Sequence, residues 1–191
     1  MRTRKSHSQR VLAIDPMSYG FGFVVLESPT LVVDWGMPFI RRGNHERTLA
    51  EIGALIRLYE PGLLIIEESK GSRRCDRIQK LLEEVSQIKV RGLKIRRLPA
   101  KRVKKVFQAF GAKTKYEIAH TIAQQLPELT SRLPRFRKPW MSEDKRTCIF
   151  DAAALALTYL HSRSIGRKSQ VPFASPLPLT DSAVMALPNS K

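Results

Sequence analysis

Apolar residues recur along the chain with two spacings, and these spacings predict the secondary structure. Short runs rich in Val, Ile, Leu and Phe between turn residues are typical of strands, whereas apolar residues repeated every three or four positions indicate helices. By the first criterion we expect strands at residues 11–15, 21–27, 31–35, 63–67 and 93–98. By the second we expect helices at about residues 49–59, 75–89, 100–108, 114–126 and 143–162.

The connections between these elements predict how the strands pair. Pro16 and Gly20 favour a turn between the first two strands, and residues 28–30 (SPT) favour another before the third, so the first three strands form an antiparallel meander. The run LLIIE (63–67) is continuously apolar and lies between two helical patterns, as expected of a central parallel strand covered on both faces. The order of elements predicts an α/β domain, a mixed five-stranded sheet flanked by helices.

The two ends of the chain lack such periodicity. Residues 1–10 are rich in Lys and Arg without an apolar repeat, which indicates a basic flexible arm. Residues 164–191 are rich in proline and show no sustained period, which predicts a disordered tail. The ordered domain is therefore expected at residues 11–163.

The charge of the chain narrows the class of partner. Lys and Arg number 34 against 17 Asp and Glu, a formal net charge of +17 at pH 7. A nucleic acid, whose phosphates many cations can neutralise, fits better than an anionic membrane or an acidic protein. No apolar run approaches the roughly 18 residues of a spanning helix, so we expect a cytoplasmic protein. Neither the cysteines nor the histidines show metal-ligand spacing, which argues against a zinc site.

Three carboxylates stand in or at the end of apolar runs, where an unpaired charge is costly to desolvate. Asp15 ends the first strand, Glu67 ends the buried fourth strand, and Asp151 interrupts the apolar part of the last helix. Taken singly, each is equally well explained as a turn or capping residue. Together, at one edge of a sheet, they predict a site for two Mg²⁺ or Mn²⁺ ions, an arrangement suited to phosphodiester cleavage. Asp34 is interpreted as a turn residue.

Four segments stand in a characteristic order along the chain: VLAIDPMSYGFGFVVLE, YEPGLLIIEES, LPAKRVKKVFQAFGAKTKYEIAH and IFDAAALALTYLHS. Their order and spacing resemble the RuvC-like Holliday junction resolvases of the RNase H-like nuclease superfamily. The likeness covers about residues 11–162. The resemblance implies an RNase H-like fold and a metal-dependent endodeoxyribonuclease that cuts branched DNA in recombination or repair. It also implies a homodimer, and catalytic metal ligands at Asp15, Glu67 and Asp151.

Two positions depart from the family's pattern. Met17 stands where the family turn has Gly, and Cys148 stands where the final helix carries an acidic residue or His. Because a thiol is a poor Mg²⁺ ligand, we expect a fourth ligand from Asp144, with Glu143 as the alternative. Acids in the first turn of a helix after Ser142 are also explained by capping alone, so both interpretations stay open.

Basic residues that follow or surround these motifs are candidates for contacting nucleic acid. The resemblance places two lysines, Lys104 and Lys115, close to DNA at the active site. Three further cations are candidates because they lie near these motifs in the sequence: Lys101 before Lys104, and Arg73 and Arg74 after Glu67. The alternative explanation is that these basic residues simply form a face of the protein in contact with water. Phe136 and Trp140 lie among cations as well, where they either stack on bases or pin a loop to the core.

Two alternatives keep part of this interpretation. The same fold acting on structured or ribosomal RNA would account equally well for the basic charge. A junction-binding protein without catalysis would account for Cys148 at the position where an acid is expected. Cleavage assays with a four-way junction and with a structured RNA distinguish a DNA nuclease from an RNA nuclease. Tight binding of the junction without cutting would identify the protein that lacks catalysis.

Overall fold

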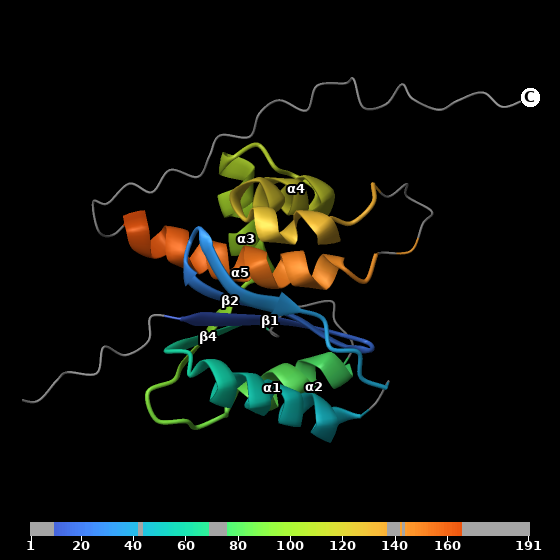
Figure 1. The fold of residues 1–191 in the computed structure, drawn as a ribbon, viewed down its shortest axis with the longest axis vertical. Helices are drawn as coiled ribbons and strands as arrows, with labels where there is room; N and C mark the ends of the chain where they lie inside the picture. The colour runs from blue at the N-terminus through green and yellow to red at the C-terminus, as the bar shows by residue number, and fades with distance from the viewer. Residues whose placement is uncertain (1–9, 42–43, 69–75, 137–141, 143, 166–191) are drawn as a thin grey trace, which may run out of the picture.

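The computed structural model describes residues 10–41, 44–68, 76–136, 142 and 144–165, and its centre is a β-sheet (Figure 1). The strands are β1 (Val11–Met17), β2 (Gly20–Ser28), β3 (Leu31–Gly36), β4 (Leu63–Glu67) and β5 (Lys94–Leu98). The sheet has five strands in the order β3-β2-β1-β4-β5. The first three are antiparallel, and β4 runs parallel to both β1 and β5. The predicted mixed five-stranded sheet is confirmed.

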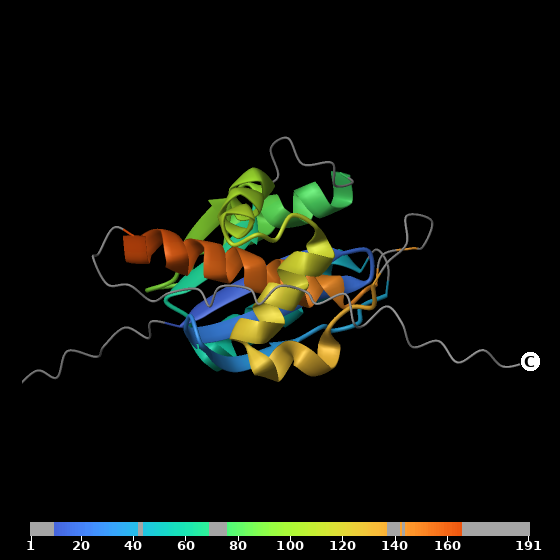
Figure 2. The same cartoon turned by 90° about the horizontal axis from the view of Figure 1, so that it is seen from above.

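Helices cover both faces of the sheet (Figure 1, Figure 2). On one face lie α1 (His45–Tyr59) and α2 (Asp76–Ser86). On the other lie α3 (Ala100–Ala109), α4 (Lys115–Gln125) and α5 (Thr147–Ile165), with the short 3₁₀ helix η1 (Pro127–Arg132) after α4. None of the helices within these described ranges combines the length and apolar composition that crossing a bilayer requires.

Alternate residues of β1 and β4 point into two separate hydrophobic cores. Ala13 and Ile65 belong to the core under α5, whereas Ile14 and Ile66 belong to the core against α1 and α2. This period of two is the pleat of a strand that is covered on both faces, which is why LLIIE is continuously apolar. The next residue of each strand therefore returns to the α5 side.

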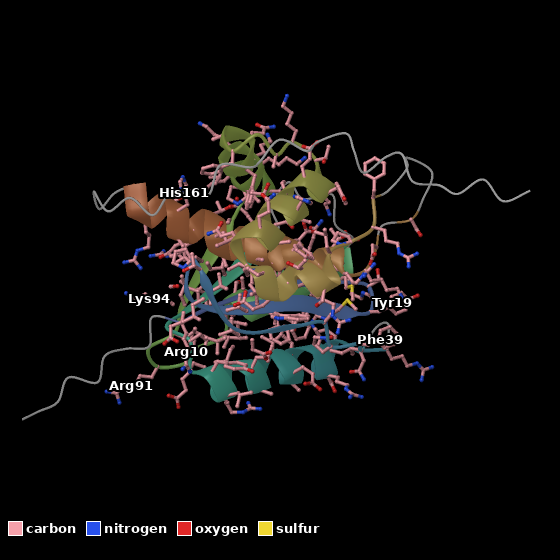
Figure 3. All side chains as sticks on the ribbon, turned by 45° about the horizontal axis from the view of Figure 1, so that its top comes forward. Arg10, Tyr19, Phe39, Arg91, Lys94 and His161 are labelled. Carbon is pink, nitrogen blue, oxygen red and sulfur yellow. The ribbon has the colours of Figure 1, made fainter. Side chains whose placement is uncertain are left out.

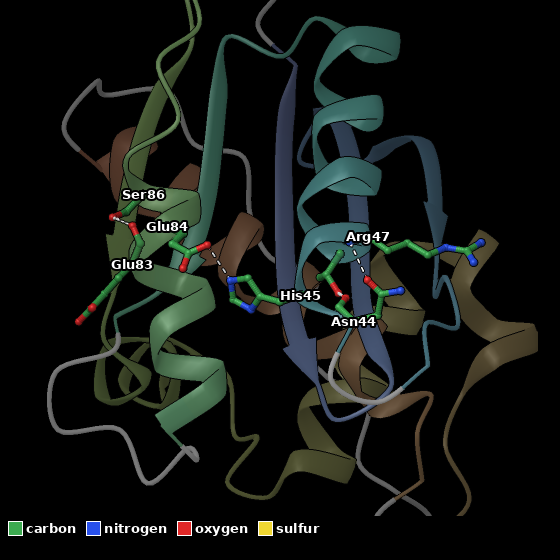
Figure 4. Close-up of polar contacts among 7 residues, drawn as sticks. Asn44, His45, Arg47, Glu83, Glu84 and Ser86 are labelled. Atoms are coloured by element: carbon green, nitrogen blue, oxygen red, sulfur yellow. Dashed lines mark hydrogen bonds and ion pairs between the residues drawn. The ribbon is translucent and has the colours of Figure 1, made fainter.

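Polar contacts cap α1 and join it to α2 on the far side of the sheet from α5 (Figure 4). The side chain of Asn44 caps α1 by accepting a hydrogen bond from the backbone N–H of Arg47 at 3.0 Å. His45 Nε2 lies 2.7 Å from Glu84 Oε2 in α2. This pair gives one of the scattered histidines a role in holding two helices together.

The structure moves several predicted boundaries. The first strand extends past Asp15 to Met17, because Pro16 and Met17 still pair with the start of β2. The last helix begins at Thr147 instead of about residue 143, so the prediction for its first turn is wrong. It ends at Ile165, two residues inside the predicted tail. Residues 1–9 of the predicted arm (1–10) and residues 166–191 of the predicted tail (164–191) lie outside the described residues.

Asp34 is a strand residue with a defined partner, not the turn residue that its position suggested. It pairs with Val25 across β2 and β3, and its carboxylate accepts a hydrogen bond from the Tyr59 hydroxyl at 2.5 Å. This hydrogen bond raises the pKa of Tyr59 to about 12. Asp34 therefore ties β3 to the end of α1.

We expect Glu117→Ala to lower the free energy of unfolding by about 1 kcal/mol at neutral pH, because it removes half of a capping box at the start of α4. Glu117 Oε2 accepts hydrogen bonds from the backbone N–H groups of Lys113 at 2.6 Å and Thr114 at 3.0 Å. These donors lower the pKa of Glu117 below its usual value.

A carboxylate with a lowered folded-state pKa stabilises the fold above its unfolded pKa and loses that contribution as the pH falls through the lowered value. The difference between wild type and Glu117→Ala should therefore shrink below about pH 4. Urea unfolding at several pH values measures it. A difference that stays constant down to pH 2 would show that the charge of Glu117 contributes nothing.

Candidate active site

The three predicted carboxylates line one open pocket of about 740 Å³ beside the start of α5. Asp15 and Glu67 reach it from the carboxyl ends of β1 and β4, and Asp151 reaches it from α5. Asp15 is only 4% exposed, whereas the side chain of Asp151 is 27% exposed. Two strands and one helix thus bring together side chains that are up to 136 positions apart in sequence.

Strand register explains why Asp15 and Glu67 meet. Ile14 pairs with Ile66 in the parallel β1–β4 ladder, so the residue after each lies at the same edge of the sheet. Asp15 and Glu67 each lie two residues after a residue of the core under α5, Ala13 and Ile65, so their side chains point to the same face of the sheet. Glu67, rather than the adjacent Glu68, is therefore the residue that lines the pocket.

A glycine in β2 lets α5 approach the sheet closely enough to bring Asp151 into the pocket. Gly22 pairs with Asp15, and a β-carbon at Gly22 would lie 2.3 Å from the carbonyl carbon of Cys148 and 2.6 Å from the backbone nitrogen of Ile149. The first turn of α5 therefore rests directly on the backbone of β2. Asp151 lies one turn further along the same helix.

Cys148 lies near two of the carboxylates as a buried, neutral thiol. It is 4% exposed, and burial, followed by the negative charges of Asp15 and Asp151, raises the pKa of its thiol to about 12. A thiolate is therefore strongly disfavoured at neutral pH. At the position where the resemblance implies an acid, the chain has a packing residue between α5 and the sheet.

Two of the predicted cationic residues line the same pocket. Lys115, at the start of α4, places Nζ 3.0 Å from Oδ2 of Asp151, and Lys104 contributes from α3. Lys101 is exposed on α3 and is not part of the pocket lining. Arg73 and Arg74 lie outside the described residues. The pocket thus combines carboxylates with cations that can face a phosphate.

Asp144 lines the pocket from the segment before α5, not from the helix itself. Its carboxylate accepts hydrogen bonds from the backbone N–H of Arg146 at 3.0 Å and from Nη2 of the same arginine at 2.5 Å. The side-chain hydrogen bond from Arg146 lowers the pKa of Asp144. Arg146 therefore offsets the charge that Asp144 would bring to a metal ion. Glu143 lies outside the described residues.

The donor chemistry of the pocket fits Mg²⁺ or Mn²⁺. Asp15, Glu67 and Asp151 offer hard carboxylate oxygens, and one of these groups is almost fully buried. Within the described parts of the chain, however, no three His, Cys, Asp or Glu side chains are placed so that they could hold an ion. Binding an ion here would require these side chains to turn toward one another.

Sequence reasoning did not identify two other residues at this pocket, Tyr19 and Lys145. The available signals were an aromatic residue in the turn after Asp15 and a cation next to Asp144. Phe136, which the sequence analysis singles out, is 69% exposed, and its ring lies perpendicular to the Tyr116 ring with the centroids 5.4 Å apart. Trp140 lies outside the described residues.

The sheet order, the two helical layers and the helix that crosses β1 and β2 define an RNase H-like fold of the RuvC type. Among solved structures, Thermus thermophilus RuvC in complex with a Holliday junction substrate matches with a TM-score of 0.55 and 17% identity, over 83% of this chain and 96% of that chain. A second Thermus thermophilus RuvC structure matches with a TM-score of 0.53 and 17% identity, over 82% and 96%. No protein-family model and no curated protein sequence matches the chain.

Proposed function

We propose that the chain is a divalent-metal-dependent endonuclease that cleaves structured DNA, with the four-way Holliday junction as its substrate. One observation carries the proposal: Asp15, Glu67 and Asp151 share one pocket with Lys104 and Lys115. The pocket lies in the fold of a nuclease solved with a Holliday junction substrate, and the chain carries a net charge of +17.

Asp15, Glu67 and Asp151 would hold the ions, Mg²⁺ or Mn²⁺. A bound pair of such ions supplies the positive charge that activates an attacking water and stabilises the leaving oxygen of the phosphodiester. Lys104 and Lys115 would neutralise phosphate oxygens, because both line the pocket that holds the carboxylates. Lys115 Nζ lies 3.0 Å from Asp151 Oδ2.

Cleavage of matched substrates tests the proposal. A labelled four-way junction, a duplex of the same arm sequence and a structured RNA are incubated with Mg²⁺, Mn²⁺ or EDTA. We expect cutting of the junction with either metal, none with EDTA, and little cutting of the duplex. Cutting of the RNA alone would favour the RNA-processing alternative. Tight junction binding without cutting in either metal would favour the inactive binding protein.

We expect the affinity for DNA to fall linearly with salt on logarithmic axes, because phosphate contacts dominate binding by a chain of net charge +17. Six phosphate contacts would give a slope of about −5 on duplex DNA. Lys104→Gln should weaken binding to all sequences alike and reduce the slope by about 1. Fluorescence anisotropy at several salt concentrations measures both effects, and a slope near zero would contradict the electrostatic interpretation.

We expect Asp144→Asn to lower the cleavage rate at least about tenfold, which corresponds to about 1.4 kcal/mol, while Cys148→Ser changes it little. Arg146→Gln shows how Asp144 acts, because it removes the guanidinium that holds the Asp144 carboxylate. A ligand role predicts that Arg146→Gln keeps or raises activity. A purely structural pair predicts equal losses in both variants. A wild-type cleavage rate for Asp144→Asn would show that Asp144 is not a ligand and that Asp15, Glu67 and Asp151 are the only carboxylates needed.

A further inference from the structure

An aromatic pair with a lysine above it lies at the edge of the candidate active site. The rings of Tyr19 and Phe39 stack with centroids 5.7 Å apart and an interplanar angle of 7°. Lys145 Nζ lies 5.2 Å from the Tyr19 centroid and 5.7 Å from the Phe39 centroid. Tyr19 and Lys145 also line the carboxylate pocket. Figure 3 shows the two rings together at the end of the molecule opposite His161.

Backbone contacts hold the two rings in place. Gly20 forms a β-bridge with Phe39, and Ile40 N–H donates a hydrogen bond to the Tyr19 carbonyl at 3.1 Å. Gly20 has a φ of +121°, and a β-carbon there would lie 2.0 Å from the Pro38 carbonyl oxygen. Only glycine therefore lets this segment pack so closely on the β1–β2 turn. The positions of the two rings are therefore fixed by backbone contacts and not by burial of the side chains.

The pair is exposed although its position is fixed. Phe39 is 63% exposed and Tyr19 is 36% exposed, so apolar ring surface stays in contact with water. Cations lie close by: Lys145 lies over the rings, and Arg77 Nη2 donates to the Ser18 carbonyl in the same turn at 3.2 Å. Flat aromatic surface beside cations is the combination that proteins use to hold unpaired nucleobases.

We propose that Tyr19, Phe39 and Lys145 form a stacking platform for an unpaired nucleobase of the nucleic acid that binds in the carboxylate pocket. The proposal rests on the proposed function only in needing a nucleic acid at that pocket. A base at a branch point or distorted step offers an open face for stacking, whereas a base inside a duplex has both faces covered by its neighbours. The platform therefore favours branched or distorted DNA over plain duplex.

Continuity with the pocket is the reason to assign this surface to nucleic acid and not to a protein partner. Tyr19 and Lys145 each belong both to the platform and to the pocket that holds Asp15 and Asp151. A strand whose phosphate lies at the carboxylates would bring its neighbouring bases to these rings.

Binding without cleavage tests the platform. A four-way junction with 2-aminopurine at the branch point and a matched duplex are titrated in EDTA with wild type, Phe39→Leu, Phe39→Trp and Tyr19→Phe. We expect wild type to prefer the junction and to quench the probe. Phe39→Leu should lose about tenfold in junction affinity and the quenching, with less than about a twofold change on duplex. Both variants that keep a ring should behave like wild type.

Phe136→Leu is the matched control, because Phe136 has a similar exposed fraction of 69% but lies after η1 and contacts Tyr116. It should leave the quenching unchanged. Equal losses in Phe136→Leu and Phe39→Leu would overturn the assignment to the Tyr19–Phe39 pair. Retained quenching and junction preference in Phe39→Leu would overturn it too. Thermal unfolding of each variant shows that it is folded, as expected for an exposed ring.

Junction cleavage measured in parallel keeps this proposal separate from the nuclease proposal. A wild-type protein that quenches the probe but cuts nothing in Mg²⁺ or Mn²⁺ contradicts the nuclease and supports the platform. A wild-type protein that cuts the junction, with Phe39→Leu keeping full preference for it, contradicts the platform and supports the nuclease.

Discussion

Asp15→Asn, Glu67→Gln and Asp151→Asn are each expected to lower junction cleavage by about a thousandfold or more, a loss of about 4 kcal/mol in transition-state stabilisation. Each substitution keeps the size of the side chain and removes a charge needed to hold the metal ions. Junction binding in EDTA should persist or tighten, because the basic surface is intact and one repulsion with phosphate is gone. Single-turnover cleavage and anisotropy measure the two effects.

Glu68→Gln is the control for this series. Glu68 directly follows Glu67, its N–H donates to the Leu98 carbonyl at 2.9 Å, and its side chain is not part of the pocket lining. It should cut at the wild-type rate. An active Glu67→Gln with an inactive Glu68→Gln would show that the register of β4 is shifted by one residue, since adjacent strand residues face opposite sides.

Gly22→Ala is expected to lower the free energy of unfolding by about 3 kcal/mol and to reduce cleavage as well. The new β-carbon would meet the carbonyl carbon and oxygen of Cys148 at 2.3 and 2.4 Å. These are backbone atoms, so no side-chain rotation relieves the clash and α5 must move away from β2. Moving α5 separates Asp151 from Asp15. Chemical denaturation and junction cleavage measure the two losses.

Gly53→Ala is the matched control for this substitution. Gly53 lies inside α1, and a β-carbon there would meet only the flexible end of Arg57 at 3.3 Å. Because alanine is the better helix former, Gly53→Ala should raise the free energy of unfolding by up to about 1 kcal/mol. Wild-type stability in Gly22→Ala would contradict the close contact between α5 and β2.

Local pattern was sufficient to predict the sheet and the positions of Asp15 and Glu67 near the carboxyl ends of β1 and β4. LLIIE is apolar at every position before Glu67 because β4 is covered on both faces, and turn residues mark the ends of the first strands. Side-chain alternation and turn preference are properties of neighbouring residues, so they are visible in the sequence. The same reasoning predicts that Asp15 and Glu67 lie at one edge of a sheet, where both line the pocket.

Tertiary structure alone decided the arrangement around those carboxylates. Arg146 binds the Asp144 carboxylate, and α5 begins only at Thr147, whereas the sequence predicts a helix from about residue 143. In the sequence, Gly22 has the features of an ordinary hairpin glycine. In the structure it determines how closely α5 approaches β2. Tyr19 and Phe39 stack from positions 20 residues apart. Such contacts depend on how distant segments pack, and a periodic pattern of polar and apolar residues carries no information about those distances.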